Sequence, residues 1–231
     1  MRVALVLVIS MWSAVSMATP RPGAPCRQCT LDLPSKTDAP VPLVVLLHGD
    51  RQAASTLESW WTKAVLARGW ALLSLQCPRD HKCVDSYWQW DGDPQWVFDQ
   101  VAAVGKQVAI DPARTYLVGW SGGASWIGDR AQAWTPVFAA VVIHGGGIAP
   151  RDEGCPARGL PAYFLVGDKN PLHAYARELR AYFDACKADV TWDLLKGAAH
   201  DGEEDALTRS PTKAKAILDW LADHARAATP A

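Results

Sequence analysis

Short, uninterrupted apolar runs that alternate with amphipathic stretches are the strongest constraint on the fold of this chain. Leu43-Val44-Val45-Leu46-Leu47 is such a run, and it is typical of a strand that is buried on both faces. Further strands are expected at residues 70–75, 114–119, 137–144, 162–166 and 190–195, and helices at 56–68, from about 94, and at 122–134, 173–187 and 206–227. This alternation predicts an α/β fold, with a mostly parallel sheet flanked by helices and no separate lid domain.

The N-terminus has the pattern of a secretory signal peptide. Arg2 precedes an apolar run over residues 3–9, and Ser16-Met17-Ala18 forms a small-x-small cleavage site. The run is too short to span a bilayer. A fixed N-terminal anchor is the less favoured alternative. We therefore expect a signal peptide over residues 1–18, an exposed arm over 19–42 and one domain over 43–228. The mature protein would be secreted or periplasmic, without stable membrane insertion.

Length and net charge indicate the number of domains and bear on the expected partners. The chain has 231 residues, which suits one sizeable domain. Without Arg2, 22 basic and 24 acidic residues remain. This balance gives no reason to expect nucleic acid as a partner.

Six cysteines follow the predicted cleavage site. In an oxidising compartment disulfides are the default, and six cysteines allow 15 pairings. The interpretation favoured is Cys77–Cys83 closing a loop, Cys155–Cys186 joining two late segments and Cys26–Cys29 tying the arm. Cys26-Arg27-Gln28-Cys29 also has the spacing of a redox or zinc half-site, but it lacks a second pair and a βαβ context. No metal or other cofactor is expected.

Gly119-Trp120-Ser121-Gly122-Gly123 follows the apolar segment 115–118. A G-x-S-x-G pattern between a strand and a helix is typical of a turn that exposes a nucleophilic serine. The glycines are needed because neighbouring side chains would collide in this strained turn. The alternative is an ordinary turn with an incidental serine.

Two other segments support a nucleophilic serine. His200 lies after the last expected strand, and the order serine, acid, histidine is the one found with this turn. His48-Gly49-Asp50 follows the 43–47 strand. The backbone amides of Asp50 and Gly122 would form an oxyanion hole. The Asp50 carboxylate would oppose an anionic transition state unless it points away or pairs with Arg51.

With these pieces the chain resembles the secreted α/β-hydrolase esterases, particularly the polyhydroxybutyrate-depolymerase and feruloyl-esterase-like group. The matching features are His48-Gly49-x-x-Gln52, the loop with Trp88 and Trp90, the Ser121 motif and Ala199-His200. They span about residues 40–225. The resemblance implies the α/β-hydrolase fold and cleavage of a small-molecule or polymer-end ester through an acyl-enzyme. The group commonly has glycine where this chain has Arg51.

The acid of the predicted triad is the least determined member. Related hydrolases usually place it three residues after the glycine that ends the 162–166 strand, and that position is Asn170. We predict that Asp168 serves as the acid. Asn170 as an amide that orients the imidazole, or an acid from elsewhere such as Asp152, Glu153 or Asp193, remain alternatives.

Several tryptophans lie near the expected site. Trp88, Trp90 and Trp120 could line an aromatic substrate pocket or simply cover the sheet. Two other classes of function remain open. One is a serine peptidase or acyltransferase of the same fold, and the other is a hydrolase-like binding protein without catalysis.

Overall fold

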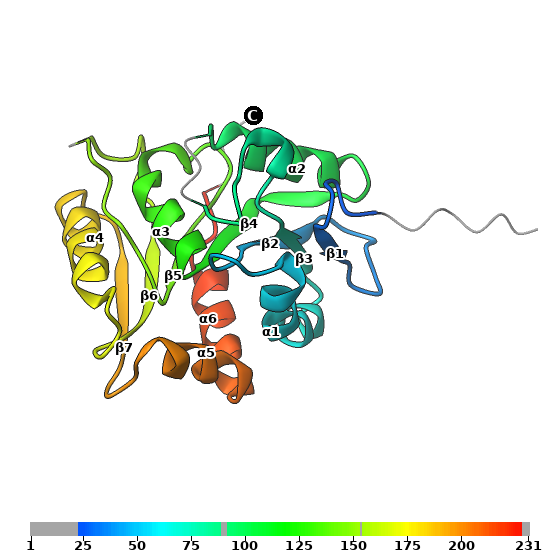
Figure 1. Cartoon of the computed structure of the whole chain (residues 1–231). Helices are drawn as coiled ribbons and strands as arrows, with labels where there is room; N and C mark the ends of the chain where they lie inside the picture. The colour runs from blue at the N-terminus through cyan, green and yellow to red at the C-terminus, as the bar shows by residue number, and fades with distance from the viewer. Residues whose placement is uncertain (1–22, 89–91, 153, 228–231) are drawn as a thin grey trace, which may run out of the picture.

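A seven-stranded sheet in the order β1-β3-β2-β4-β5-β6-β7 forms the centre of the molecule (Figure 1). The computed structural model describes residues 23–88, 92–152 and 154–227. The predicted signal peptide, Trp90 and Glu153 lie outside these ranges. All strands are parallel except β1, which pairs antiparallel with β3. The strands are β1 (Thr30–Asp32), β2 (Val41–Leu47), β3 (Ala71–Leu75), β4 (Ile110–Trp120), β5 (Val141–His144), β6 (Ala162–Gly167) and β7 (Val190–Leu195).

Helices cover both faces of the sheet (Figure 1). One face carries α2 (Gln95–Gly105), α3 (Gly122–Asp129) and α4 (His173–Ala185), and the other carries α1 (Ala54–Ala67), α5 (His200–Thr208) and α6 (Pro211–Asp223). Two short 3₁₀ turns, Arg79–His81 and Ala131–Ala133, complete the described elements. The predicted α/β architecture is confirmed, because the parallel strands are covered on both sides by the helices that connect them.

The apolar run in β2 explains why this strand is central. Leu43, Val45 and Leu47 point into the core beneath α2, α3 and α4. Val44 and Leu46 point into the second core, beneath α1, α5 and α6. Every residue of β2 is buried. Since successive side chains of a strand alternate between faces, a strand between two helical layers needs apolar residues at every position.

Several elements differ from the sequence prediction: α3 ends at Asp129 instead of 134, β5 begins at Val141 instead of 137, and two differences change the number of elements. The arm contributes β1, whose short edge pairing with β3 was not expected. The single helix expected over residues 206–227 is two helices, α5 and α6. The second begins at Pro211, directly after Ser210. Proline fits the first turn of a helix but lacks the N–H needed inside one, so the chain restarts there. The first of the two helices also begins earlier than expected, at His200.

The three predicted disulfides, Cys26–Cys29, Cys77–Cys83 and Cys155–Cys186, are all present. Cys77–Cys83 closes the segment that leads from β3 toward Trp88. Cys155–Cys186 ties the loop after β5 to the end of α4. Both bridges therefore hold loops that extend from the sheet.

The carboxyl ends of the parallel strands carry the residues of interest. His48 follows β2, Ser121 follows β4, Asn170 follows β6 and His200 follows β7. Parallel strands bring these ends to one edge, where open α/β sheets bind their ligands. Within the described ranges, no helix combines the length and apolar character needed to cross a membrane.

Candidate active site

Ser121 occupies a strained turn between β4 and α3. Its backbone has φ 51° and ψ −111°, a conformation that a non-glycine residue adopts only when its surroundings impose it. A Cβ at Gly119 would lie 2.5 Å from the Ala124 nitrogen, and one at Gly123 would collide with the Leu47 carbonyl oxygen. These two positions therefore require glycine, and the turn holds the Ser121 side chain above the end of the sheet.

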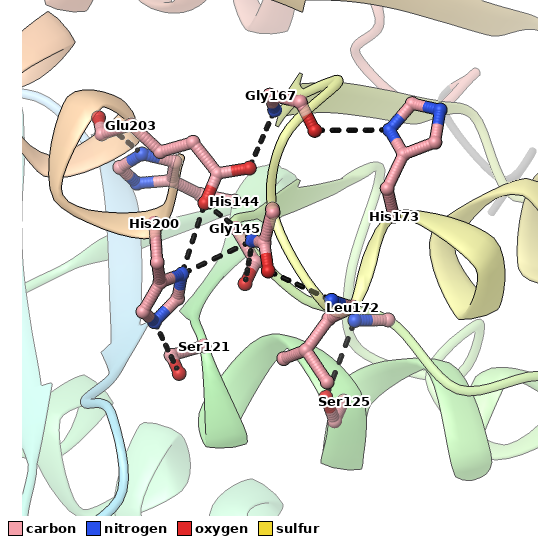
Figure 2. A network of polar contacts seen from close by, with 11 residues as sticks. Ser121, Ser125, His144, Gly145, Gly167, Leu172, His173, His200 and Glu203 are labelled. Carbon is pink, nitrogen blue, oxygen red and sulfur yellow. Dashed lines mark hydrogen bonds and ion pairs between the residues drawn. The ribbon is translucent and has the colours of Figure 1, made fainter. Parts of the chain in front are cut away.

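His200 contacts the serine directly. Its Nε2 lies 2.9 Å from Ser121 Oγ (Figure 2). The imidazole lies parallel to the indole of Trp120, with ring centroids 4.5 Å apart and an interplanar angle of 8°. The structure thus brings together the predicted serine and histidine, which are 79 positions apart in the chain.

The carboxylate beside His200 belongs to Glu203. Oε2 of Glu203 lies 2.9 Å from Nδ1 of His200 (Figure 2), and the Glu203 side chain is fully buried. Its Oε1 accepts a hydrogen bond of 2.5 Å from the Gly167 amide. Asn170 Nδ2 donates to Oε2 at 2.6 Å. A buried carboxylate is tolerated only when its oxygens are satisfied in this way.

The hydrogen-bond pattern determines the tautomer of His200. Asn170 Nδ2 carries two hydrogens, and they face Glu203 Oε2 and, at 3.2 Å, the Gly145 carbonyl oxygen. The Asn170 amide therefore has no hydrogen left for His200 Nδ1, although the two nitrogens are 3.1 Å apart. Nδ1 must itself carry a proton and donate it to Glu203. Nε2 is then unprotonated and accepts the hydroxyl of Ser121, which is the arrangement of a general base.

Asp168 takes a different place from the one predicted. It is exposed, and its Oδ1 accepts a hydrogen bond of 2.6 Å from the Gly197 amide. Its carboxylate therefore stabilises the turn after β7. The position beside Nδ1 of His200 is occupied by Glu203. The physical reason is the direction of the chain: Gly167 and Asn170 point toward the buried glutamate, and Asp168 between them points outward.

The other acids considered lie elsewhere as well. Asp193 accepts hydrogen bonds from the Tyr163 hydroxyl and from Lys213, and Asp152 is exposed on the rim of a cleft. Glu203 was not among the predicted residues, because the last helix was expected to begin at 206. The available signal was the spacing His200-x-x-Glu203, which places both side chains on one face once the helix begins at His200.

A second histidine lies behind the site. His144 ends β5 and is fully buried, and its Nε2 donates to the Glu203 carbonyl oxygen at 2.8 Å (Figure 2). Its ring packs against Trp120 with centroids 4.4 Å apart. Burial lowers the pKa of His144 to about 3. This neutral histidine therefore fixes the backbone of the first turn of α5.

His48 shapes the loop opposite the serine. Its Nδ1 donates to the Gly49 carbonyl oxygen at 2.7 Å, and its Nε2 accepts from the Cys77 amide at 3.0 Å. Burial lowers the pKa of His48 to about 4. Because both nitrogens are used within the loop, His48 positions the following Gly49 and Asp50.

The amides of Asp50 and Gly122 are available to bind an oxygen. Within the described ranges, neither amide donates a hydrogen bond. The Asp50 side chain packs directly on the Gly122 Cα, where an added Cβ would collide with its carboxyl oxygens. Its Oδ1 accepts from the Trp88 amide at 3.2 Å, and the Arg51 guanidinium lies over the Tyr87 ring. Burial raises the pKa of the Asp50 carboxyl above its ordinary value.

A cleft of about 890 Å³ opens beside the serine. Asp50, Trp88, Ser121 and Gly122 line it, together with Ile148 and Pro150 of the loop after β5. Charged side chains lie around this cleft, at Asp129, Arg130, Arg151 and Asp152. The site is therefore open to a ligand with polar groups.

The three predicted tryptophans are not equivalent. Trp88 is buried and lines the cleft, where it packs against Trp126. Trp120 is also buried, but it contacts the histidines of the site and does not line the cleft. Trp90 lies outside the described residues. Across the described part of the chain, no group of three histidine, cysteine, aspartate or glutamate side chains could hold a metal ion.

Comparisons with known proteins agree with this fold. Residues 29–154, more than half of the chain, match the family Esterase PHB depolymerase. No curated protein matches the sequence. Among solved structures, a thermostable esterase has a TM-score of 0.65 at 18% identity, and the match covers 86% of this chain and 59% of that one. The chain thus spans less than two thirds of that esterase.

For two further solved structures, the match with this chain extends over most of their length. Esterase PE8 has a TM-score of 0.60 at 20% identity, with 83% of this chain and 97% of that chain covered. The Bacillus cereus carboxylesterase has a TM-score of 0.57 at 16% identity, with 85% and 93% covered. At these identities the structures support the fold, and the family match supports the class of enzyme. The chain therefore belongs to the PHB depolymerase family of esterases and has the α/β-hydrolase fold.

Proposed function

We propose that this chain is an exported serine hydrolase that cleaves carboxylic esters through an acyl-enzyme, with Ser121, His200 and Glu203 as its triad. The proposal rests on a chain of two contacts, from Ser121 Oγ to Nε2 of His200 and from Nδ1 of His200 to the carboxylate of Glu203. That carboxylate is buried, and both of its oxygens have hydrogen-bond partners. The family match supports the same class of reaction. The substrate is a small-molecule or polymer-end ester that enters the cleft beside Ser121.

The mechanism follows from the hydrogen bonds. His200 Nε2 takes the proton of Ser121 as Oγ attacks the ester carbonyl, and Glu203 stabilises the resulting imidazolium through Nδ1. The amides of Asp50 and Gly122 bind the oxyanion of the tetrahedral intermediate. His200 then returns the proton to the leaving alcohol, and water repeats the sequence to release the acid.

Export is the second part of the proposal. Three disulfides support an oxidising compartment, and the N-terminal sequence has the pattern of a removed signal peptide. Mass spectrometry of the protein recovered outside the cytoplasm should give an N-terminus near residue 19. A chain recovered with residues 1–18 intact would contradict cleavage.

The catalytic proposal is tested with a fluorophosphonate probe and intact-mass spectrometry. We expect one adduct per chain, on Ser121, and its absence in Ser121→Ala. Hydrolysis of short p-nitrophenyl esters should be lost in the same variant. Assays with peptide substrates and with an added acceptor alcohol separate a peptidase or acyltransferase from an esterase. A folded protein that takes up no probe would contradict the proposal.

A further inference from the structure

Two side chains from different elements face the same nitrogen of His200. Glu203 Oε2, from the first turn of α5, lies 2.9 Å from Nδ1. Asn170 Nδ2, from the loop after β6, lies 3.1 Å from it. Both side chains are buried. The site therefore holds an amide and a carboxylate at two positions that could each serve the histidine.

The bonds of Asn170 show what it does. Its Oδ1 accepts from the Leu172 amide at 2.8 Å, which fixes the orientation of the amide group. Its Nδ2 then donates to Glu203 Oε2 and to the Gly145 carbonyl oxygen. The bond to Glu203 holds Oε2 against Nδ1 of His200. The second hydrogen prevents Asn170 from donating to His200, so it also excludes the wrong tautomer.

We propose that Asn170 is a positioning residue that acts through Glu203, and that the carboxylate of this site can be exchanged with the amide between positions 170 and 203. This inference rests on the proposed function. It concerns which of the two positions carries the acid, and the general mechanism would be the same in either arrangement.

The exchange can be followed atom by atom. In Glu203→Gln, the amide oxygen can keep the bond from the Gly167 amide, which places its NH₂ where Oε2 now lies. In Asn170→Asp, one oxygen keeps the bond from the Leu172 amide, and the other replaces Nδ2. With both changes, the new amide at position 203 can donate to the new carboxylate at position 170. That carboxylate can in turn accept the proton of His200 Nδ1. The total charge is unchanged.

Two groups lose a partner in the exchange. The second hydrogen of the new amide at position 203 has no acceptor when Nδ1 of His200, which lies 2.9 Å from Oε2 of Glu203, carries a proton. Nδ2 of Asn170 donates to the Gly145 carbonyl oxygen at 3.2 Å, and a carboxylate oxygen in its place would face that carbonyl without a hydrogen. We therefore expect partial recovery. Asn170→Asp alone would place two carboxyl groups 2.6 Å apart, so the pair would have to share a proton.

The experiment compares Glu203→Gln with the double variant Asn170→Asp/Glu203→Gln, using kcat on a short p-nitrophenyl ester. We expect the single variant to lose about 10²- to 10⁴-fold in kcat, as when a triad acid becomes an amide. The double variant should regain at least about 10-fold over it. The matched control is Asp168→Asn, which removes an exposed carboxylate from the loop that also holds Asn170. This variant should retain the kcat of the wild type. A folded double variant no more active than Glu203→Gln would overturn the proposal.

A second readout does not depend on turnover. The ¹⁵N spectrum of the histidine rings, assigned with His200→Gln, reports which nitrogen of His200 carries the proton. Nδ1 should carry the proton in the wild type and again in the double variant. In Glu203→Gln the Nδ1 signal should differ from that of the wild type, because Nδ1 has lost the carboxylate that accepts its proton. If the wild type neither reacts with the fluorophosphonate nor cleaves esters, the proposed function fails while this spectrum still tests the pair.

Should the double variant not fold, Asn170→Ala tests the positioning role by itself. Removal of the amide should lower kcat by about 10-fold with an unchanged KM, because the group acts on the base and not on the bound ester. It should also change the Nδ1 signal of His200. An unchanged kcat and an unchanged ¹⁵N spectrum would overturn the positioning role.

Discussion

The indole of Trp120 lies flat against the imidazole of His200, with ring centroids 4.5 Å apart and an angle of 8° between the rings. Trp120 is the residue before the serine, and it is held from behind by the edge of Trp60 and by His144. The chain neighbour of Ser121 therefore supports the ring of His200. Ser121 and His200 are thus positioned by the same strand end.

Trp120→Phe should lower kcat by about 10-fold with little change in KM. The smaller ring leaves the face of His200 partly unsupported, and small displacements of a catalytic base are costly. The matched control is Trp134→Phe, because Trp134 is a fully buried tryptophan in the core that lies on the opposite face of the sheet. Thermal unfolding and ester kinetics of both variants should show lost stability in each and lost kcat in Trp120→Phe alone. Equal kcat in the two variants would count against this role.

The acid of the triad can be identified by two isosteric changes. Glu203→Gln should reduce kcat by about 10²- to 10⁴-fold, since the buried partner of Nδ1 loses its charge. Asp168→Asn should leave kcat within about 2-fold, because Asp168 is exposed and contacts the Gly197 amide. The measurement is steady-state kinetics on one ester at one pH. A large loss in Asp168→Asn, with Glu203→Gln active, would restore Asp168 as the acid.

Asp50 should impose its own pH dependence on catalysis. Burial raises the pKa of its carboxyl, so the neutral form persists to a higher pH than usual. As the pH rises through this pKa, a negative charge appears beside the Asp50 and Gly122 amides, which are proposed to bind the oxyanion, and it should slow the reaction. The variant Asp50→Asn keeps the backbone amide, and its side-chain oxygen can still accept the hydrogen bond from the Trp88 amide. The asparagine side chain does not ionise.

We therefore expect the ratio of kcat/KM between Asp50→Asn and the wild type to increase with pH, by on the order of 10-fold in total. Taking the ratio cancels every titration that the two proteins share. Profiles from about pH 4 to 9 on a neutral ester, which bracket the titration of a carboxyl with a raised pKa, are sufficient. A ratio that stays constant with pH would show that the Asp50 charge does not reach the transition state.

Stability should fall on acidification because of His48 and His144. Burial lowers their pKa values to about 4 and about 3, from 6.5 in an unfolded chain. Below pH 6.5 the unfolded chain takes up protons that the folded protein does not, so unfolding becomes favoured as the pH falls toward these values. Each histidine should cost about 2 kcal/mol of unfolding free energy between about pH 6.5 and 5.

Urea denaturation at about pH 7, 6 and 5 measures this loss, with His144→Asn as the comparison. The variant should be less stable at neutral pH, since a buried ring is replaced, but its stability should depend less on pH. A variant with the same pH dependence as the wild type would assign the acid sensitivity to other groups.

Local sequence was sufficient for most of the fold. The uninterrupted apolar run of β2 indicates a strand between two helical layers, and the glycines around Ser121 indicate the turn that exposes it. The strand and the turn each depend on residues close in sequence or on a pattern that repeats along one element. The favoured cysteine pairs are also those of the structure, but the sequence itself leaves 15 pairings open.

Only the tertiary structure showed which carboxylate lies beside Nδ1 of His200. Asp168 and Glu203 are both acidic residues near His200 in the fold, and the spacing His200-x-x-Glu203 points to Glu203 only once α5 is known to begin at His200. The choice depends on where α5 begins, on the Gly167 amide and on Asn170, which converge on Glu203 from three different segments. A buried charge needs all of these partners at once, and the sequence shows them only separately. The sequence by itself therefore determined the parallel part of the sheet and the turn that holds Ser121, whereas packing determined which carboxylate lies beside His200.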